Sequence, residues 1–231
     1  MQKDWTNFVD RPDSAFSSPH NKWLLDEIKD GFHHDIFDDK VRVHTYDVTY
    51  AFFLHRLRRL NRKIKMLEVG TAAGNSIRLW DRYFEQLEYH GVDIAVLPQA
   101  LTAMKDVNEK RKEQKMTVHT GDANNMTSLR EIAQIANVGL SEESSKFDLI
   151  IDDGSHASIH HIVTLNSLYP YLKNGGIYVI EDMGASAWVD ELDKPYDCSE
   201  REYSLCKSLG VVQLINKTHN KESFRNPPGP R

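Results

Sequence analysis

The sequence predicts an α/β domain with a doubly wound, mostly parallel sheet and a short N-terminal helical appendage. From residue 65 onward, short apolar runs alternate with amphipathic segments of helical length, which is the pattern of right-handed βαβ units. The run 147–151 is rich in Ile and Leu, as expected for a strand covered on both faces. A length of 231 residues suits one such domain.

The chain is predicted to divide into three parts. Residues 1–44 form the appendage, with one short helix around 21–31, and we expect its pairs His33-His34 and Asp38-Asp39 to be solvated. Residues 45–220 form the main domain. The Pro-rich tail 221–231 is expected to be disordered, because proline fits neither helix interiors nor central strands.

The individual elements follow from the spacing of apolar residues. A helix is predicted over 46–60. Further on, Ile77, Trp80 and Phe84 lie three or four residues apart, which predicts another helix, and Pro98 suits the first position of the next. The predicted strands are 65–69, 89–93, 116–119, 147–151, 177–180 and 211–216. The predicted helices between the first five strands are 75–87, 98–112, 126–137 and 157–172.

Composition excludes several classes of protein. The net charge of -5 gives no electrostatic case for nucleic acid, and we interpret the basic residues from Arg56 to Lys65 as the solvated face and end of a helix. No apolar run approaches the roughly 20 residues that cross a bilayer, and the N-terminus lacks a signal-peptide core. Cys198 and Cys206 make no disulfide framework, so a reducing, cytoplasmic location is expected.

A glycine turn follows the first predicted strand, in Glu68-Val-Gly-Thr-Ala-Ala-Gly74. Its glycines would let the backbone approach a ligand, and the next helix offers its N-terminal N–H groups. The spacing is G-x-x-x-G and not the G-x-G-x-x-G of dinucleotide sites. The alternative is that Gly70 and Gly74 only permit tight packing of strand against helix.

Three acidic residues lie at strand ends near this turn. Asp93 ends the next strand and could accept both hydroxyls of a ribose. Glu68 would repel a pyrophosphate but attract an ammonium group, which favours S-adenosylmethionine over NAD. Asp122, after the third strand, is the expected contact at the adenine.

Two acidic pairs end the fourth and fifth strands, Asp152-Asp153 and Glu181-Asp182. Ligands bind outside the carboxyl ends of such strands, and clustered carboxylates repel one another unless a cation neutralises them. Their hard oxygen atoms suit Mg²⁺ or a similar divalent ion. The alternative is that Asp152 or Asp153 caps the helix that follows.

His156 follows the first acidic pair and could take a proton near pH 7. The alternatives are a purely structural histidine, or a zinc pair with His160. The sequence has no H-E-x-x-H pattern to support zinc.

These segments resemble the class I S-adenosylmethionine-dependent methyltransferases, which have a Rossmann-like fold. More narrowly, they are similar to the metal-dependent macrolide-sugar O-methyltransferases of the macrocin and mycinamicin type, a family that includes the cephalosporin hydroxylase-like proteins. The strings Ile151-Asp-Asp-Gly-Ser-His156 and Gly175-Gly-Ile-Tyr-Val-Ile-Glu-Asp182 are the most specific part. The resembling stretches are 39–46, 65–79, 91–94, 147–156 and 175–188.

The resemblance implies an Mg²⁺-dependent O-methyltransferase that acts on a hydroxyl of a small polyhydroxylated acceptor, such as a sugar or glycoside. It makes His156 the general base, and Asp153, Glu181 and Asp182 the metal ligands. His44 and Tyr46 fall in a segment that covers the cofactor. The residues expected at S-adenosylmethionine are Glu68, Gly70, Thr71, Gly74, Asn75, Ser76, Asp93, Asp122 and Asp152.

Two rival functions are an NAD-dependent oxidoreductase on a similar sheet and a cofactor-binding protein without catalysis. The expected partner is a small molecule, with neither nucleic acid nor membrane, and a homo-oligomer is compatible with the sequence. The stretch 189–201 matches no pattern.

Overall fold

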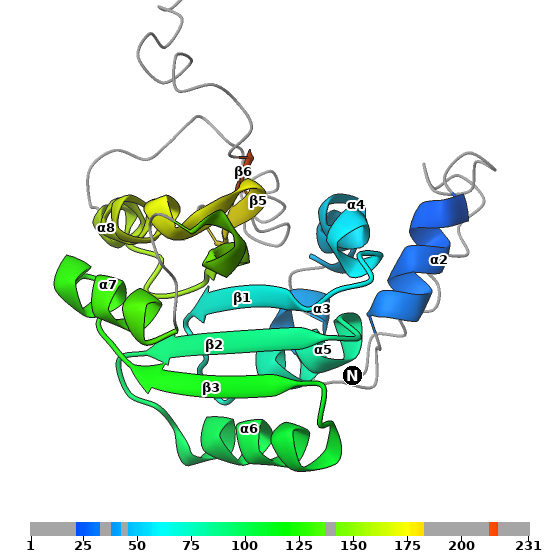
Figure 1. Cartoon of the computed structure of the whole chain (residues 1–231), viewed down its shortest axis with the longest axis horizontal. Helices are drawn as coiled ribbons and strands as arrows, with labels where there is room; N and C mark the ends of the chain where they lie inside the picture. Colours follow the sequence, from blue (N-terminus) through cyan, green and yellow to red (C-terminus); the bar gives the residue numbers. More distant parts are fainter. Residues whose placement is uncertain (1–21, 33–37, 43–45, 137–141, 183–212, 217–231) are drawn as a thin grey trace, which may run out of the picture.

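The computed structural model describes residues 22–32, 38–42, 46–136, 142–182 and 213–216. Its centre is a six-stranded sheet of order β3-β2-β1-β4-β5-β6 (Figure 1). The first five strands run parallel, and β6 pairs antiparallel with β5. The predicted doubly wound, mostly parallel sheet is therefore confirmed. The strands are β1 (Ile64–Val69), β2 (Leu87–Asp93), β3 (Lys115–Thr120), β4 (Phe147–Asp152), β5 (Leu172–Ile180) and β6 (Gln213–Asn216).

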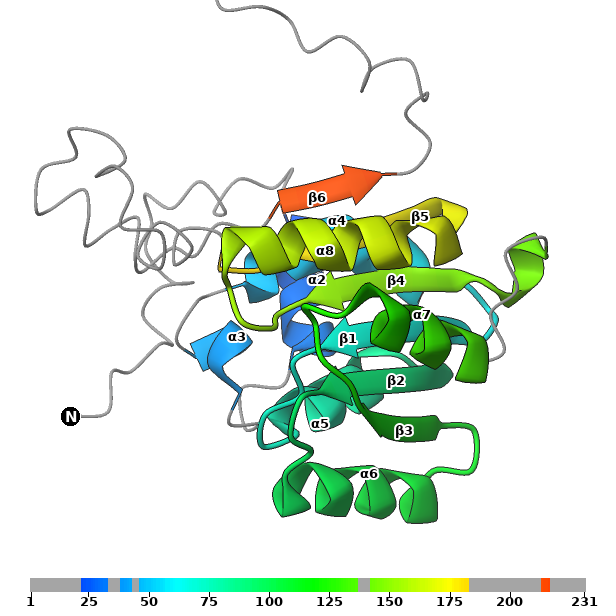
Figure 2. The same ribbon diagram turned by 90° about the vertical axis from the view of Figure 1, so that its left-hand side faces the viewer.

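Helices cover both faces of the sheet. Figure 2 shows α7 and α8 on one face, with α2, α4 and α5 behind the sheet. Alternate strand residues enter the two layers, because successive side chains of a strand point to opposite faces: Met66 joins one core cluster and Leu67 the other. The helices of the main domain are α4 (Asp47–Arg58), α5 (Asn75–Tyr83), α6 (Pro98–Lys110), α7 (Met126–Ile135) and α8 (Ser158–Leu168), with short 3-10 turns at Glu143–Ser145 and Tyr169–Tyr171.

The N-terminal helices belong to the same core as the sheet. Helix α2 (Lys22–Gly31) and the four-residue helix α3 (Asp39–Arg42) bury Leu24, Phe32 and Val41 in the cluster that also contains Trp80. The rings of Phe32 and Tyr83 lie 4.7 Å apart. The described residues of the predicted appendage therefore pack in one core with residues of the main domain. Helix α3 was not predicted, because four residues carry no periodicity.

Three predicted boundaries are wrong, the ends of two helices and the start of β5. The helix predicted over 75–87 ends at Tyr83, because Phe84 is extended and Leu87 begins β2, where its N–H donates to the side chain of Gln114 at 2.5 Å. Strand β5 begins at Leu172 and not at residue 177, and the helix predicted over 157–172 ends at Leu168, so Gly175 and Gly176 lie inside a strand. The left-handed φ of 77° at Gly175 requires glycine there.

The basic residues at the end of α4 and after it do more than form a solvated face. Arg62 makes an ion pair with the buried Asp148 at 2.7 Å, and Arg58 makes one with Glu27 at 3.1 Å. Within the described part of the chain, no helix is long and apolar enough to cross a membrane. The predictions for His33-His34, His44, both cysteines, 189–201 and the tail concern residues outside the described ranges.

Candidate active site

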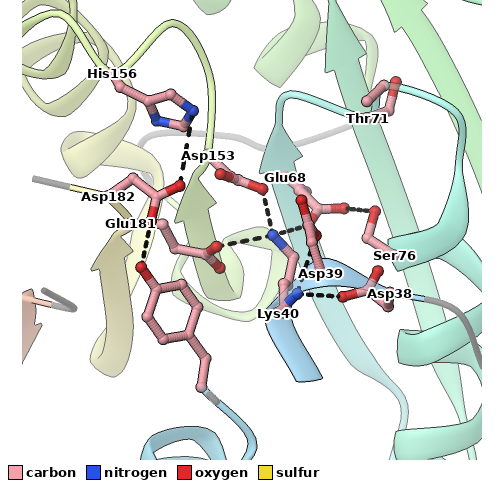
Figure 3. A network of polar contacts seen from close by, with 12 residues as sticks. Asp38, Asp39, Lys40, Glu68, Thr71, Ser76, Asp153, His156, Glu181 and Asp182 are labelled. Atoms are coloured by element: carbon pink, nitrogen blue, oxygen red, sulfur yellow. Dashed lines mark hydrogen bonds and ion pairs between the residues drawn. The ribbon is translucent and has the colours of Figure 1, made fainter. Parts of the chain in front are cut away.

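Three strand ends bring the acidic residues together. Strand β4 lies between β1 and β5, and the register sets Val69 beside Asp152 and Asp152 beside Ile180. Because the three strands are parallel, their carboxyl ends meet at one edge of the sheet. The side chains of Glu68, Asp153, Glu181 and Asp182 therefore converge there (Figure 3).

Asp153, His156 and Asp182 form a group that could hold a metal ion. One ligand atom from each lies within 4.8 Å of the others, and all three residues are half-buried. Nε2 of His156 is 3.9 Å from Oδ2 of Asp182. Both residues are in the left-handed region, with φ of 59° and 52°. Such backbone costs about 1–3 kcal/mol per residue and persists only where the surroundings impose it, typically at functional sites.

Glu181 lies deeper than its neighbour Asp182. It is 1% exposed, and its carboxylate accepts hydrogen bonds from the phenol of Tyr50 and from Nζ of Lys40. The phenol of Tyr46, at the start of α4, donates to the carboxylate of Asp182. The predicted acids thus form an inner set, Glu68 and Glu181, which is buried, and an outer residue, Asp182, which is half-buried. Asp153 lies between them.

Lys40, which no sequence pattern predicted at this site, lies among the acidic residues. Its Nζ donates to Asp153, lies 2.9 Å from Oε2 of Glu181 and 3.5 Å from Oε1 of Glu68, and only 1% of the residue is exposed. Burial alone would lower the pKa of this ammonium, but the three carboxylates reverse that effect and hold it well above its ordinary value. Lys40 therefore remains charged.

The expectation that the Asp38-Asp39 pair is solvated is wrong for Asp38, which is 2% exposed. Its carboxylate accepts the N–H of Lys40 at 2.9 Å, and burial raises its pKa to about 7. Asp39 is exposed. The spacing of residues did not predict the contacts of Lys40, because its partners lie 113 and 141 positions away along the chain.

Glu68, which the sequence predicts at the cofactor, is fully buried. Its carboxylate accepts hydrogen bonds from Ser76 at 2.7 Å, Trp80 at 3.2 Å and Tyr89 at 2.5 Å. The ammonium beside it is that of Lys40. In this structure Glu68 and Ser76 are hydrogen-bonded to each other, and both are buried.

The turn itself is shaped by Asp93. Its Oδ2 accepts the N–H groups of Thr71 at 3.0 Å and Ala72 at 2.9 Å, and its Oδ1 accepts that of Ala95 at 3.1 Å. A half-buried carboxylate at the end of β2 thus fixes the loop after β1. The Thr71 hydroxyl also donates to Oδ2, at 3.4 Å, whereas Oδ1 accepts only the Ala95 N–H among the described residues, so Oδ1 retains a lone pair for a ligand.

The two glycines of the turn are required by packing. A Cβ atom on Gly70 would lie 1.9 Å from the backbone oxygen of Asp153, and one on Gly74 would lie 2.6 Å from Cα of Ala100. Both residues also have left-handed φ, of 90° and 80°. Close approaches of the backbone therefore require glycine at both positions, and the turn runs directly against the acidic group.

The remaining predicted residues have local roles in this structure. Asp152 is buried, and its Oδ2 lies 3.1 Å from Nδ1 of His161. Neither Asp152 nor Asp153 caps α8, whose N-cap is Ala157 without a side-chain bond, so the capping alternative is wrong.

Asp122 is exposed and accepts the N–H of Asn124 at 2.8 Å. Asn75 begins α5 and is exposed. Nδ1 of His160 lies 2.5 Å from Oγ of Ser155. The group that could hold a metal includes His156 but not His160, which gives the zinc-pair alternative no support.

Known proteins resemble this chain in sequence and in structure. One relative is the 8-demethyl-8-alpha-L-rhamnosyl tetracenomycin-C 2'-O-methyltransferase of Streptomyces olivaceus, 33% identical over 194 residues, which are 80% of this chain and 44% of that protein. Another is the mycinamicin VI 2''-O-methyltransferase of Micromonospora griseorubida, 30% identical over 64% of this chain and 35% of that protein.

Among solved structures, the MycE methyltransferase of the mycinamycin biosynthetic pathway, in complex with Mg and SAH, matches with a TM-score of 0.55 at 25% identity. The match covers 79% of this chain and 44% of MycE. The chain thus spans less than half of the length of each of these proteins. The family model described as a methyltransferase domain matches residues 60–223. Because that match spans most of the chain, the protein belongs to the methyltransferase domain family.

Proposed function

We propose that the chain binds S-adenosylmethionine at the turn after β1 and transfers its methyl group, with a divalent cation, to a hydroxyl of a small polyhydroxylated acceptor such as a sugar or glycoside. One observation carries the proposal: the glycine turn touches the metal-competent group, since a single added carbon at Gly70 would collide with Asp153. Cofactor and cation would therefore act on the same acceptor. The two relatives described above, the rhamnosyl tetracenomycin-C 2'-O-methyltransferase and the mycinamicin VI 2''-O-methyltransferase, support this acceptor class.

The residues at the strand ends fit a hard divalent ion such as Mg²⁺, which takes carboxylate oxygens and keeps several waters. Asp153 and Asp182 are half-buried and would hold it. Glu181, the third expected ligand, lies further in, on Lys40 and Tyr50. When bound, the cation would supply Lewis-acid polarisation of the acceptor hydroxyl.

Residues of the chain would orient the cofactor and remove the proton from the acceptor hydroxyl. His156 is the proposed general base. Its Nε2 lies 3.9 Å from Oδ2 of Asp182. The Tyr46 phenol holds the Asp182 carboxylate, and Asp93 holds the turn that would carry the cofactor. A rigid frame of this kind contributes by keeping the hydroxyl and the methyl group in near-attack geometry.

The NAD-dependent alternative is disfavoured on different grounds than expected. The buried Glu68 has Lys40 beside it, so repulsion of a pyrophosphate by Glu68 is no longer an argument. The match to the methyltransferase domain weighs against NAD instead.

The first test is a thermal-shift panel with S-adenosylmethionine, S-adenosylhomocysteine and NAD, each with and without Mg²⁺. We expect both S-adenosyl compounds to raise the melting temperature and NAD to leave it unchanged. Methyl transfer to glycosides with adjacent hydroxyls should vanish in EDTA and return with Mg²⁺. Stabilisation by NAD alone, or full transfer in chelator, would contradict the proposal.

A further inference from the structure

We propose that His161, held by Asp152, is a positioning residue that orients the imidazole of His156 for the reaction through one bridging water. The inference rests on the proposed function, because His156 is the general base in that function. It concerns Nδ1 of His156, whereas Nε2 is the nitrogen near Asp182.

Helix α8 turns polar side chains into the protein and apolar ones toward solvent. His161, Thr164 and Ser167 are buried, whereas Ile159 and Ile162 are 58% and 55% exposed. The hydroxyls of Thr164 and Ser167 donate to carbonyl groups of their own helix, at 2.7 and 2.6 Å. The side chain of His161 differs, because its hydrogen bond leaves the helix.

The partner of His161 determines which of its ring nitrogens carries the hydrogen. Nδ1 of His161 lies 3.1 Å from Oδ2 of Asp152, and the two side chains are 7% and 2% exposed. A carboxylate accepts hydrogen bonds and does not donate them, so Nδ1 carries the hydrogen and Nε2 of the neutral ring keeps a lone pair. This Nε2 is buried and has no hydrogen-bond partner among the described residues. It is therefore a buried acceptor that requires a donor.

His156 supplies the complementary group. If Nε2 of His156 is to take a proton, the hydrogen of the neutral ring must be on Nδ1. Nδ1 of His156 is also buried and has no hydrogen-bond partner in the described part of the chain. The centres of the His156 and His161 rings lie 6.4 Å apart. At this separation one water would join the nitrogens, accepting from His156 and donating to His161.

The interior beside Asp152 holds a further polar group of this kind. The hydroxyl of Tyr178 is buried and has no hydrogen-bond partner among the described residues. Burial raises the pKa of Tyr178, and the charge of Asp152 adds to this effect. Both residues lie on the same face of the sheet, because Asp152 pairs with Ile180 and strand residues two apart share a face. Buried polar groups without a protein partner are usually satisfied by ordered water, which supports water in this part of the interior.

The arrangement would act on the general base in two ways. It would hold the hydrogen of His156 on Nδ1, which keeps the lone pair on Nε2 available for the acceptor hydroxyl. When Nε2 takes the proton of that hydroxyl, the ring becomes a cation, and the charge of Asp152, acting through His161, would stabilise it. The proton stays on His156. A histidine that only supports the packing of α8 would have neither effect.

The first measurement is the position of the hydrogen on His156. Nitrogen-15 chemical shifts of the histidine rings report it, in the full chain with S-adenosylhomocysteine and Mg²⁺, and His156→Ala assigns the signals. We expect hydrogen on Nδ1 of His156 in the starting protein. Asp152→Asn should move it to Nε2, because the asparagine amide donates to Nδ1 of His161 and reverses the direction of every hydrogen bond that follows.

The second measurement is methyl transfer. Asp152→Asn and His161→Phe should lower kcat by about 10–100-fold, the loss typical of residues that orient a functional group, with little change in KM for the cofactor. His161→Gln should recover part of the loss, because its amide can donate to Asp152 and accept from the water. In a His156→Ala background neither substitution should lower kcat further, since residues that act as a unit are not additive. Thr164→Val, which removes a hydroxyl bonded within α8, is the matched control and should change neither measurement.

The outcomes separate this inference from the proposed function. Hydrogen on Nε2 of His156 in the starting protein, or full kcat in His161→Phe, would overturn the inference and leave methyl transfer intact. An equal loss from His161→Phe with and without His156 would make His161 structural and would overturn it as well. If His161→Phe does not fold, Asp152→Asn carries the test, because it keeps the shape of the side chain. A starting protein without methyl transfer would refute the proposed function, and the nitrogen-15 shifts would still decide whether His161 sets the hydrogen on His156.

Discussion

The backbone N–H of Thr71 donates a 3.0 Å hydrogen bond to Oδ2 of Asp93, which ties the turn after β1 to the end of β2. The neighbouring N–H of Ala72 donates to the same oxygen at 2.9 Å. The carboxylate expected to meet the ribose therefore also sets the shape of the loop that would carry the rest of the cofactor.

Asp93→Ala should weaken S-adenosylmethionine binding by about 1–3 kcal/mol, the cost of leaving polar partners unpaired. Isothermal titration calorimetry measures the change. Asp106→Ala, on α6 and paired with Arg78 at 2.8 Å, is the control and should bind normally. An unchanged affinity in Asp93→Ala would mean that neither the ribose contact nor the turn depends on this carboxylate.

His156→Ala should lower the chemical step by roughly 10²–10⁴, as expected for loss of a general base. Single-turnover methyl transfer measures it, and the pH–rate profile should lose its limb near neutrality. Binding of S-adenosylmethionine and Mn²⁺ should persist, which separates a base from a metal ligand. His160→Ala is the neighbouring control. Wild-type turnover in His156→Ala would show a structural histidine.

Glu68→Gln should destabilise the fold by about 3 kcal/mol or more, because it removes one partner of a buried ion pair. The amide nitrogen of glutamine also cannot accept the hydrogen bonds that Ser76, Trp80 and Tyr89 direct at the carboxylate. Urea denaturation gives the free energy of unfolding, with the exposed Glu85→Gln as control. Equal stability of the two variants would contradict this role of Glu68.

His90 should make the fold sensitive to acid. Burial lowers its pKa from 6.5 to about 4. Between these values the unfolded chain binds more protons than the folded one, so this contribution is complete above pH 6.5 and is lost as the pH falls toward 4. At pH 5 the loss amounts to about 2 kcal/mol.

Denaturation of wild type and His90→Gln at pH 7.5 and pH 5 tests this. The variant should lose less stability on acidification, whereas the control His55→Gln, on α4, should follow wild type. Parallel losses in wild type and His90→Gln would refute the contribution of His90.

The fold was largely predictable because the strands of a sheet that is covered on both faces are continuous apolar runs in the sequence. The first four strands begin and end within two residues of their predicted bounds. The errors arise where the same residue pattern is compatible with a helix and with a strand. Leu87 continues the helical spacing of α5 yet begins β2, and the glycines before Ile177 resemble a stop signal yet lie in β5.

The sequence by itself determined the meeting of Asp153 with Asp182 and His156, because acids that follow neighbouring parallel strands must reach the same edge of the sheet. Only the tertiary structure decided that Glu68 turns into the core and that Lys40 completes the site. The direction of a side chain at a strand end depends on which partners the other layers supply. Those partners come from helices that are distant in the chain, so the local spacing of residues does not predict these contacts.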